Sequence, residues 1–549
     1  MHLNDITPLE CMYHWEKHTP NDIYLRQPKN LEWHEYTWAQ VADRVRRTAS
    51  FINSFNLAKG SRIALWSSNS MDWVIVDLAI MLSGNVSVPL YPGQDISSAN
   101  YILEHSECDV MFLGAVDQLP AIAQGDIKRA MPTVAMIGCN IDCDHRLESI
   151  VTEYEPFADS PIPKDDDMMT ILYTSGTTGN PKGVVHVHGT PGKVVPRMIA
   201  AWKLGNVSGE RERFFSFLPM SHAAERIAVQ MNSFYLSPTV SFSEGLATFG
   251  DELRSVQPTF FFAVPRLWAK FKAGVDAKVP AEAQAQMGEE QRAQIRAMLG
   301  LAKAKFVITG SAPTPIEIQE WFISMGINLR DGYGMTENFI DGCIFNEEDP
   351  IPGCVGKPFP GSEVKISEEG EVCFKGAGIM QGYYKNPEKT AEVIIDGWYH
   401  TGDSGRIDEN GNLWVTGRLG EVFKTSKGKF IQPSSLENEF GGVNVLAQLL
   451  IFGHGKDQPL LLTNLSEVAH ASGKSRDELT RDLEKALEEI NSHLQPYEKI
   501  GQIFVTKEDW RIDNGLLTPT MKLKRRQIEE HYGAFVHAHL GASKIAWEE

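Results

Sequence analysis

The sequence predicts an α/β fold: a large N-terminal domain of α/β sheets with a β subdomain, then a small mobile α+β domain. Three observations predict it. Strand-like and helix-like segments alternate through the first half of the chain, which indicates sheets joined by helical crossovers. From residue 363 short alternating runs replace them, as expected for a β subdomain. Beyond residue 417 a basic, glycine-interrupted stretch leads into a compact tail, so we predict domains at 1–417 and 418–549.

The first strand–helix–strand unit illustrates this alternation. A helix is predicted over 37–55, because Thr37 can cap it and an apolar stripe follows. A strand at 62–66, an apolar helix at 70–84 and a second strand at 86–90 come next. Such a unit is expected to form a right-handed parallel crossover.

Later segments continue the pattern. A turn at 409–412 lies between two alternating runs and predicts a β-hairpin, whereas the Ala/Gln/Glu-rich stretch 279–296 is predicted to be mobile. The other predicted strands lie at 109–113, 133–137, 168–173, 306–309, 449–452 and 460–463, and a charged helix at 476–493.

Composition narrows the class of protein. The 52 Lys and Arg residues against 71 Asp and Glu give a net charge of −19, which argues against nucleic acid or an anionic membrane surface as a partner. The N-terminus lacks the apolar segment of a signal peptide, no window is long enough to span a membrane, and seven scattered cysteines fit a reducing compartment. The cytoplasm is therefore the expected location. For Cys139, Cys143 and His145 we favour a structural or incidental role over zinc binding.

The most specific stretch reads YTSGTTGNPKG at 173–183. Its glycines let backbone N–H groups approach a ligand closely, its hydroxyls add donors, and Lys182 adds a positive charge. The stretch therefore suits a polyphosphate, although a Gly/Ser/Thr-rich surface turn is the alternative. It is neither a Walker loop, because Pro181 precedes the lysine and Gly183 follows it, nor a G-x-G-x-x-G loop.

A second motif, DGYGMTE, occupies 331–337. The Tyr333 ring can stack on a base, the Thr336 hydroxyl can reach a phosphate, and the Glu337 carboxylate can hold Mg²⁺, which prefers oxygen ligands. The alternative is a tight turn with an exposed tyrosine.

Two weaker signals lie nearer the C-terminus. In the TGD sequence at 401–403, the carboxylate of Asp403 suits two vicinal hydroxyls of a ribose, and Arg418 follows in a GR pair. A glycine–aspartate turn is the alternative. Lys522 lies in a basic run, of which Lys524, Arg525 and Arg526 are expected to form a solvated face.

Taken together, these motifs resemble those of the adenylate-forming superfamily, which contains acyl-CoA synthetases, peptide-synthetase adenylation domains and firefly-type luciferases. The resemblance covers nearly the whole chain. It implies that Tyr333 packs on adenine, that Thr336 contacts the α-phosphate, and that Glu337 ligates magnesium. It also implies that Asp403 binds the ribose hydroxyls with help from Arg418.

The resemblance further implies a catalytic lysine, a hinge and a path for CoA. Lys522 matches the lysine that bridges the carboxylate and the α-phosphate, and Gly420 aligns with the hinge, where many relatives carry Asp or Lys. Lys427 and Gly428 match the strand that meets the pantetheine arm. The implied catalytic residues are Lys522, His222, Thr336 and Glu337. The implied cofactor-binding residues are Thr174, Ser175, Gly176, Thr177, Thr178, Gly179, Lys182, Gly310, Ser311, Ala312, Asp331, Gly332, Tyr333, Gly334, Met335, Asp403, Arg418, Lys427 and Gly428.

Three further stretches, LPMSHAAER, VPRLWAKF and NGLLTPTMKLKRR, look most like those of long-chain fatty acyl-CoA synthetases. They imply an ATP-dependent fatty acyl-CoA ligase that uses ATP, Mg²⁺ and coenzyme A, with His222 beside the reacting carboxylate and an apolar tunnel near 260–264. A helix-capping role is the alternative for His222. The chain is shorter than most such enzymes. Transfer to a carrier protein, lactone closure and a non-catalytic nucleotide-binding relative stay open as alternatives, and so does a homodimer.

Overall fold

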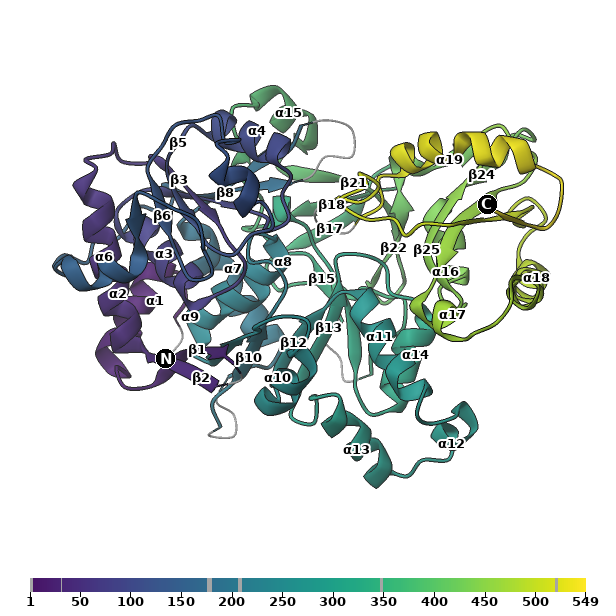
Figure 1. The fold of residues 1–549 in the computed structure, drawn as a ribbon, viewed down its shortest axis with the longest axis horizontal. Helices are drawn as coiled ribbons and strands as arrows, with labels where there is room; N and C mark the ends of the chain where they lie inside the picture. Colours follow the sequence, from purple (N-terminus) through teal and green to yellow (C-terminus); the bar gives the residue numbers. More distant parts are fainter. Residues whose placement is uncertain (1–2, 31, 175–179, 206–209, 346–348, 519–521) are drawn as a thin grey trace.

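The computed structural model describes residues 3–549 except 31, 175–179, 206–209, 346–348 and 519–521. Figure 1 shows the N-terminal sheets and helices as one body and the C-terminal domain as a second, smaller body at the opposite end, with β17, β18, β21 and β22 between them. Helices and mixed sheets alternate as the sequence predicts, so the α/β class is confirmed.

Two large sheets form the N-terminal body within the described residues. In spatial order the first contains β16 (Lys357–Pro358), β15 (Cys343–Ile344), β14 (Leu329–Tyr333), β13 (Phe306–Gly310), β12 (Phe260–Ala263), β10 (Arg213–Ser216), β11 (Thr239–Phe242), β1 (Ile23–Lys29) and β2 (Glu32–Thr37). The second contains β19 (Gly382–Tyr383), β9 (Lys182–Val187), β8 (Met168–Thr174), β4 (Val86–Leu90), β3 (Arg62–Trp66), β5 (Cys108–Leu113), β6 (Thr133–Ala135) and β7 (His145–Arg146).

The predicted crossover is present, because β3 and β4 pair in parallel around α3 (Met71–Leu82). α3 is buried on almost every side, as its continuous apolar sequence requires, and the Ser70 hydroxyl caps it. α2 (Trp38–Ser54) begins at Thr37 with a capping box that uses Gln40. Local signals therefore fix the ends of both helices.

The remaining helices of the N-terminal body cover the sheet faces or join the strands. They are α1 (Pro8–His18), α4 (Ile96–Ser106), α5 (Leu119–Ala123), α6 (Leu147–Glu153), α7 (Gly189–Ala201), α8 (Ala223–Glu225), a π-helical turn (Arg226–Met231), α9 (Asn232–Leu236), α10 (Phe249–Val256), α11 (Pro265–Asp276), α12 (Ala281–Ala285), α13 (Glu289–Met298), α14 (Ile316–Ser324), a 3₁₀ turn (Thr336–Asn338) and α15 (Pro387–Val393). The stretch 279–296, predicted to be mobile, instead forms α12 and most of α13, since Ala, Gln and Glu favour helices.

The β subdomain and the C-terminal domain follow. The subdomain sheet contains β17 (Glu363–Ile366), β18 (Glu371–Lys375), β21 (Trp398–Ile407), β20 (Ile394–Ile395) and β22 (Leu413–Arg418). The predicted hairpin is the β21–β22 pair. The C-terminal strands are β23 (Phe423–Lys424), β24 (Phe430–Ile431), β25 (Leu446–Phe452), β26 (Leu460–Leu465), β27 (Ile503–Thr506) and β28 (Ile545–Trp547), and the helical segments are a 3₁₀ turn (Leu419–Glu421), α16 (Pro433–Glu439), α17 (Glu467–Ala471), α18 (Arg476–His493) and α19 (Arg525–His539).

Two apolar layers hold the four-stranded C-terminal sheet. α18 buries Leu483 and Leu487 on one face, and α19 buries Ile528 and Tyr532 on the other. The C-terminal domain therefore has a core of its own. This core positions the loop that precedes α19, in which Lys522 lies.

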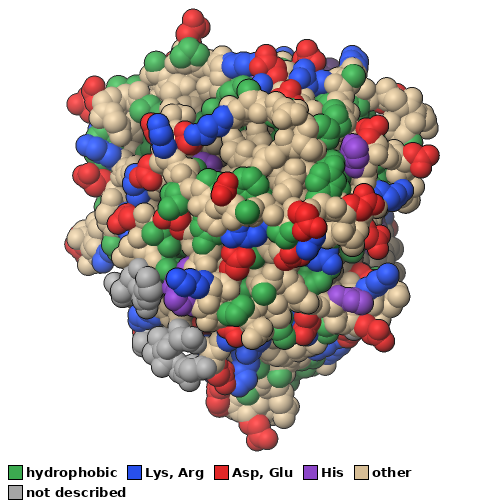
Figure 2. Space-filling view, turned by 90° about the vertical axis from the view of Figure 1, so that its left-hand side faces the viewer, with side chains coloured by type: hydrophobic (Ala, Val, Ile, Leu, Met, Phe, Trp, Pro, Cys, Tyr) green, Lys and Arg blue, Asp and Glu red, His purple; other side chains and the backbone are tan. Residues whose placement is uncertain are grey.

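The distribution of surface charge and the character of the helices agree with the composition. Figure 2 shows acidic and basic side chains interspersed over the face at the left-hand side of Figure 1. Within the described residues, no helix has the length and apolar character needed to cross a bilayer.

Candidate active site

The phosphate loop predicted from the sequence connects two antiparallel strands, β8 and β9. Thr174 ends β8 and pairs in register with Lys182, which begins β9, and the Thr174 hydroxyl donates to the Lys182 carbonyl at 3.4 Å. The hairpin thus places the two ends of the loop side by side. Ser175, Gly176, Thr177, Thr178 and Gly179 lie outside the described residues.

Lys182 is half-buried, and no carboxylate among the described residues forms an ion pair with it. Its ammonium donates to the Tyr383 hydroxyl at 3.4 Å and lies 4.6 Å from the centre of the same ring. Burial lowers the pKa of Lys182, with a smaller opposing effect from Glu337. A cation without a counter-ion beside a glycine-rich loop is suited to an anionic ligand such as a polyphosphate.

Tyr383 connects the lysine to the second motif, because its hydroxyl also donates to Glu337 Oε1 at 2.9 Å. The other oxygen, Glu337 Oε2, has no hydrogen bond to a described residue and stays available. An oxygen ligand held in place by a neighbour is what a hard cation such as Mg²⁺ requires, so the residues fit that ion. Tyr383 was not predicted from the sequence, because it reaches the site through the pairing of β19 with β9.

Glycines and a buried carboxyl group surround the DGYGMTE motif. A Cβ atom at Gly310 would lie 2.8 Å from the Gly332 carbonyl, so the close approach of β13 and β14 at this point requires glycine at position 310. The adjacent Ser311 has a positive φ of 69°, and Ala312 is exposed. Burial raises the pKa of Asp331 to about 8, although Gln319 donates to its carboxyl at 3.3 Å.

His186 supports the 3₁₀ turn that carries Thr336 and Glu337. The buried His186 Nε2 lies 2.7 Å from the Thr336 carbonyl oxygen, so that nitrogen carries the proton and donates. Burial lowers the pKa of His186 to about 4, which keeps the ring neutral. Met335 and Gly334 lead into this turn, and a Cβ atom at Gly334 would collide with the Ile340 backbone at 2.8 Å.

Asp403 is the centre of the predicted ribose site. Its carboxylate is 6% exposed, accepts from the Tyr333 hydroxyl at 2.5 Å, and forms an ion pair with Arg418 Nε at 2.8 Å. Burial raises the pKa of Asp403, and the charge of Arg418 opposes that shift. Asp403 and Arg418 also face each other in the β21–β22 register.

The turn before Asp403 is held by three further groups. Gly402 has φ of 74° and donates its N–H to Glu371 Oε1 at 2.7 Å, while His400 Nδ1 lies 2.6 Å from Glu371 Oε2. The Thr401 hydroxyl accepts from the Asp403 N–H at 3.0 Å. Glu371 and His400 were not predicted from the sequence.

The structure shows the helix-capping contact of His222, and its place beside the reacting carboxylate stays a prediction. Its Nδ1 accepts from the Ala224 N–H at 3.2 Å and caps α8, so the helix-cap alternative describes a real contact. The ring also packs at 6.3 Å against Tyr91. Burial lowers the pKa of His222 to about 4, and the positive charge of Lys522 acts in the same direction.

Lys522 lies in the loop before α19. Its backbone N–H donates to the Thr518 hydroxyl at 3.1 Å. The residue keeps a large exposed fraction, yet the protein atoms around it lower the pKa of Lys522, and Arg418 acts in the same direction. The carboxylates of Asp403, Glu337 and Glu421 oppose this shift. The pKa of this tail residue therefore depends on charges of the DGYGMTE and TGD motifs.

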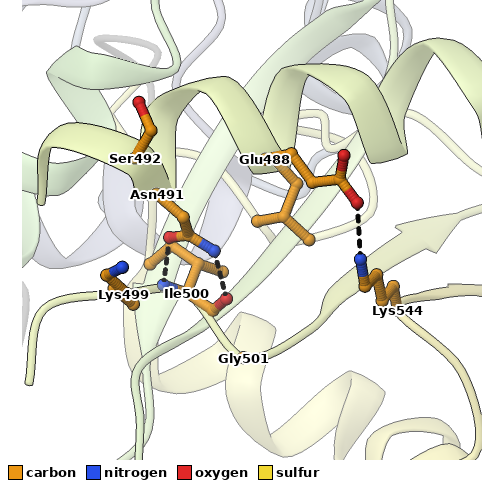
Figure 3. A pocket seen from close by; sticks show the side chains of 8 residues that line it. Glu488, Asn491, Ser492, Lys499, Ile500, Gly501 and Lys544 are labelled. Carbon is orange, nitrogen blue, oxygen red and sulfur yellow. Dashed lines mark hydrogen bonds and ion pairs between the residues drawn. The ribbon is translucent and has the colours of Figure 1, made fainter. Parts of the chain in front are cut away.

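Some predicted residues lie elsewhere. Lys427 and Gly428 are exposed in the β23–β24 hairpin, and their described contacts do not reach the site. Cys139 Sγ and Cys143 Sγ are 3.7 Å apart, whereas the His145 ring packs on Phe51. Figure 3 shows a surface pocket beside α18, lined by Glu488, Asn491 and Lys544 among others, which is separate from the residues above.

The raised pKa of Asp331 predicts a stability difference that depends on pH. Between the unfolded value near 4 and about 8, the folded chain holds a proton that the unfolded chain has lost, so this group makes the free energy of unfolding fall as the pH rises. Asp331→Asn removes the effect. Urea denaturation at pH 5 and pH 8 should show that the free energy of unfolding of the variant, relative to that of the wild type, increases with pH by up to about 1.4 kcal/mol per pH unit.

The exposed carboxylate of Asp513 provides the control for this measurement. Its pKa is lowered by Arg511, so Asp513→Asn should show no such gain between pH 5 and pH 8. Parallel curves for Asp331→Asn and the wild type would contradict the assignment.

Comparison with known proteins agrees with this geometry. The model of the AMP-binding enzyme family matches residues 12–384, and that of the AMP-binding enzyme C-terminal domain matches 421–540. The chain is similar to the long-chain-fatty-acid–CoA ligase FadD15 of Mycobacterium tuberculosis, at 26% identity over 96% of both chains. It is also similar to long-chain-fatty-acid–CoA ligase 1 of Homo sapiens, at 27% identity over 91% of this chain and 81% of the relative.

Solved structures share the fold. The adenylation domain of a carboxylate reductase from Mycobacterium chelonae superposes with a TM-score of 0.80 at 22% identity, covering 98% of this chain and 91% of that one. The anthranilate CoA ligase AuaEII, solved with anthranoyl-AMP, superposes with a TM-score of 0.79 at 18% identity, covering 97% and 98%. Since the first family model spans more than half of the sequence, the chain belongs to the AMP-binding enzyme family.

Proposed function

We propose that this protein is an ATP-dependent fatty acyl-CoA ligase that forms an acyl-adenylate and then a thioester. The observation that carries the proposal is that Tyr383 joins Lys182 to Glu337 while Asp403 joins Tyr333 to Arg418. The charges of Asp403 and Glu337 also act on the pKa of Lys522. A cation from the tail placed at a nucleotide site is required for the first half-reaction. The relatives named long-chain-fatty-acid–CoA ligases support the choice of substrate.

In the first half-reaction, a carboxylate oxygen of the fatty acid attacks the α-phosphorus of ATP. A P–O bond forms as the bond to the leaving pyrophosphate breaks, and the products are acyl-AMP and pyrophosphate. The Lys522 ammonium would stabilise the negative charge shared by the carboxylate and the α-phosphate, a positioned-charge effect that supplies several kcal/mol. Neutral His222 would lie beside the carboxylate without adding charge.

The other residues hold the nucleotide. The 174–182 hairpin and Lys182 would bind the β- and γ-phosphates, Thr336 would contact the α-phosphate, and Tyr333 would pack on adenine. Asp403 would exchange its Tyr333 and Arg418 partners in part for ribose hydroxyls. Glu337 would hold Mg²⁺, which neutralises phosphate charge when bound.

In the second half-reaction, the CoA thiol attacks the carbonyl carbon of acyl-AMP, a C–S bond forms, and AMP leaves. We propose that the C-terminal domain rotates between the two steps about the 3₁₀ turn Leu419–Glu421, which moves Lys522 away. Gly420 has open space where a Cβ atom would lie, so this residue itself does not obstruct a change in the turn. Lys427 and Gly428 would then approach the pantetheine arm.

The finer expectations from the sequence stay predictions. They are the division at 1–417 and 418–549, a long acyl chain bound near 260–264, a role in lipid metabolism, a cytoplasmic location, a homodimer and the absence of nucleic-acid partners.

The function is tested by ATP–pyrophosphate exchange with carboxylates from acetate to oleate, followed by AMP release with CoA. Fatty carboxylates should support both reactions. Exchange without CoA-dependent release, together with release on addition of a carrier protein, would instead identify an acyl-AMP ligase. Failure of exchange with every carboxylate would indicate a non-catalytic relative.

Lys522→Ala should abolish acyl-adenylate formation but leave thioester formation from supplied acyl-AMP within a few-fold of the wild type, because the lysine acts only in the first step. Quench-flow measurement of each half-reaction separates them. Lys524→Ala, two residues away, is the matched control and should retain both. Equal loss of both half-reactions in Lys522→Ala would refute its assignment.

Tyr383→Phe should raise the Mg²⁺ concentration required for pyrophosphate exchange by about 10–100-fold, since the hydroxyl that orients Glu337 is lost. Titration of Mg²⁺ at saturating ATP measures this effect, and the thermal midpoint should change little. Tyr384→Phe is the control, because Tyr384 packs on His105 and not on Glu337. An unchanged Mg²⁺ requirement in Tyr383→Phe would remove Tyr383 from the site.

A further inference from the structure

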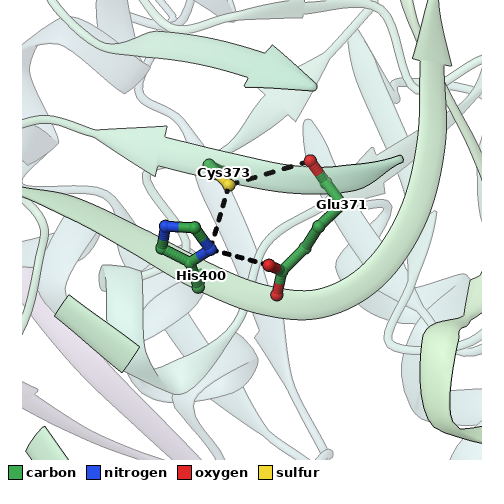
Figure 4. Close-up of side chains that lie close together, drawn as sticks. All are labelled: Glu371, Cys373 and His400. Carbon is green, nitrogen blue, oxygen red and sulfur yellow. Dashed lines mark hydrogen bonds and ion pairs between the residues drawn. The ribbon is translucent and has the colours of Figure 1, made fainter. Parts of the chain in front are cut away.

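Three side chains of different ligand type meet on the β subdomain sheet. Cys373 on β18 lies opposite His400 on β21 in the antiparallel register, and Glu371 lies two residues before Cys373. Cys373 Sγ is 3.5 Å from His400 Nδ1, and that nitrogen is 2.6 Å from Glu371 Oε2. Figure 4 shows the thiol, the imidazole and the carboxylate directed toward one another. One ligand atom from each residue lies within 4.8 Å of the other two.

These distances are close to those of a tetrahedral zinc site. With Zn–S near 2.3 Å and Zn–N near 2.0–2.1 Å, a tetrahedral angle separates sulfur and nitrogen by about 3.6 Å. The observed separation is 3.5 Å. The nitrogen-to-oxygen distance is shorter than a shared cation requires, because a hydrogen bond now joins the two atoms, and rotation of the Glu371 carboxylate can lengthen it.

We propose that Glu371, Cys373 and His400 form a binding site for Zn²⁺, with Cys373 Sγ, His400 Nδ1 and Glu371 Oε2 as ligands. Thiolate and imidazole ligands select a borderline-soft cation over Mg²⁺, which prefers an all-oxygen shell. The site is therefore chemically different from the carboxylate of Glu337.

The burial of the three residues shows from which side a cation can reach the site. Cys373 is buried, whereas the side chains of His400 and Glu371 are 23% and 16% exposed. A cation can thus reach the site from the side of His400 and Glu371. Three protein ligands leave a fourth tetrahedral position for water, as in open zinc sites.

Binding requires defined proton movements. The Cys373 thiol loses its proton to solvent, and His400 must carry its proton on Nε2 and not on Nδ1, which frees the Nδ1 lone pair. Glu371 Oε2 then exchanges its hydrogen bond for the metal. Its other oxygen, Oε1, keeps the N–H of Gly402, so the turn before Asp403 stays in place.

A second pair of cysteines lies elsewhere in the structure, and the experiment must distinguish Zn²⁺ binding there from binding at Cys373. Cys139 and Cys143 have sulfur atoms 3.7 Å apart, but the nearby His145 ring packs edge-on against Phe51 at 5.0 Å and Phe55 at 6.0 Å. Cys143→Ala removes this pair without touching β18 or β21. It is the matched control for Cys373→Ser.

The test uses the full-length protein, freed of metal with a chelator and titrated with Zn²⁺ against a chromophoric competitor. The wild type and Cys143→Ala should each bind one Zn²⁺ per chain at the same affinity. Cys373→Ser should bind at least about 100-fold more weakly, since loss of a second-shell partner alone costs about 10–100-fold. Glu371→Gln, which keeps an oxygen acceptor for Gly402, should bind at least about 10-fold more weakly.

Cobalt provides a readout that a loss of stability cannot imitate. Co²⁺ added to the wild type and to Cys143→Ala should produce a thiolate-to-cobalt charge-transfer band in the near ultraviolet, and Cys373→Ser should lack it while keeping the wild-type thermal midpoint. If Cys373→Ser unfolds, the folded Glu371→Gln variant decides through its affinity. Unchanged Zn²⁺ binding in these variants, absence of the band in the wild type, or loss of binding in Cys143→Ala would overturn the proposal.

Discussion

The ion pair between the buried carboxylate of Asp403 and the exposed side chain of Arg418 is the interaction on which the site depends. Removing a carboxylate from water costs several kcal/mol, and only close partners offset that cost. Arg418 and the Tyr333 hydroxyl provide them, and they come from the last pair of the β21–β22 hairpin and from the end of β14. One carboxylate therefore joins the main sheet, the β subdomain and the start of the C-terminal domain.

The surroundings of two lysines in the site disfavour their charged forms. Lys182 forms no ion pair with a described residue, and the pKa values of Lys182 and Lys522 are both lowered by the protein around them. A lowered lysine pKa means that the ammonium form is disfavoured relative to its state in water. Under the proposed function the phosphates of the nucleotide would favour that form, because a nearby opposite charge stabilises it.

Local signals predicted much of this arrangement. Thr37 and Ser70 mark where α2 and α3 begin, and the alternation of strand-like and helix-like segments predicts β3 and β4. The glycines of 331–337 allow the close approach of neighbouring strands. Tyr383 and His400 could not be predicted in this way. Each reaches its partner because strands distant in sequence pair in a particular register, β19 with β9 and β18 with β21. That register depends on the packing of the whole sheet.

The stretch 279–296 shows the converse case. Its Ala, Gln and Glu residues favour helices, and tertiary contacts hold α12 and α13 in place: Gln284 bonds to Asp276 and Trp321, and Ile295 is buried beside Met325. The prediction of mobility was wrong because composition alone does not reveal these contacts. For the phosphate loop, the residue types alone predict a polyphosphate ligand, and that stays a prediction.

The position of Arg418 in the chain has one further consequence, because this residue is both the partner of Asp403 and the residue immediately before the Leu419–Glu421 turn. Because Arg418 lies on β22, before the turn, rotation of the C-terminal domain would leave its ion pair with Asp403 in place. Lys522 lies beyond the turn and would move with the domain. The proposed ribose site would therefore persist through both half-reactions, while the lysine serves only the first.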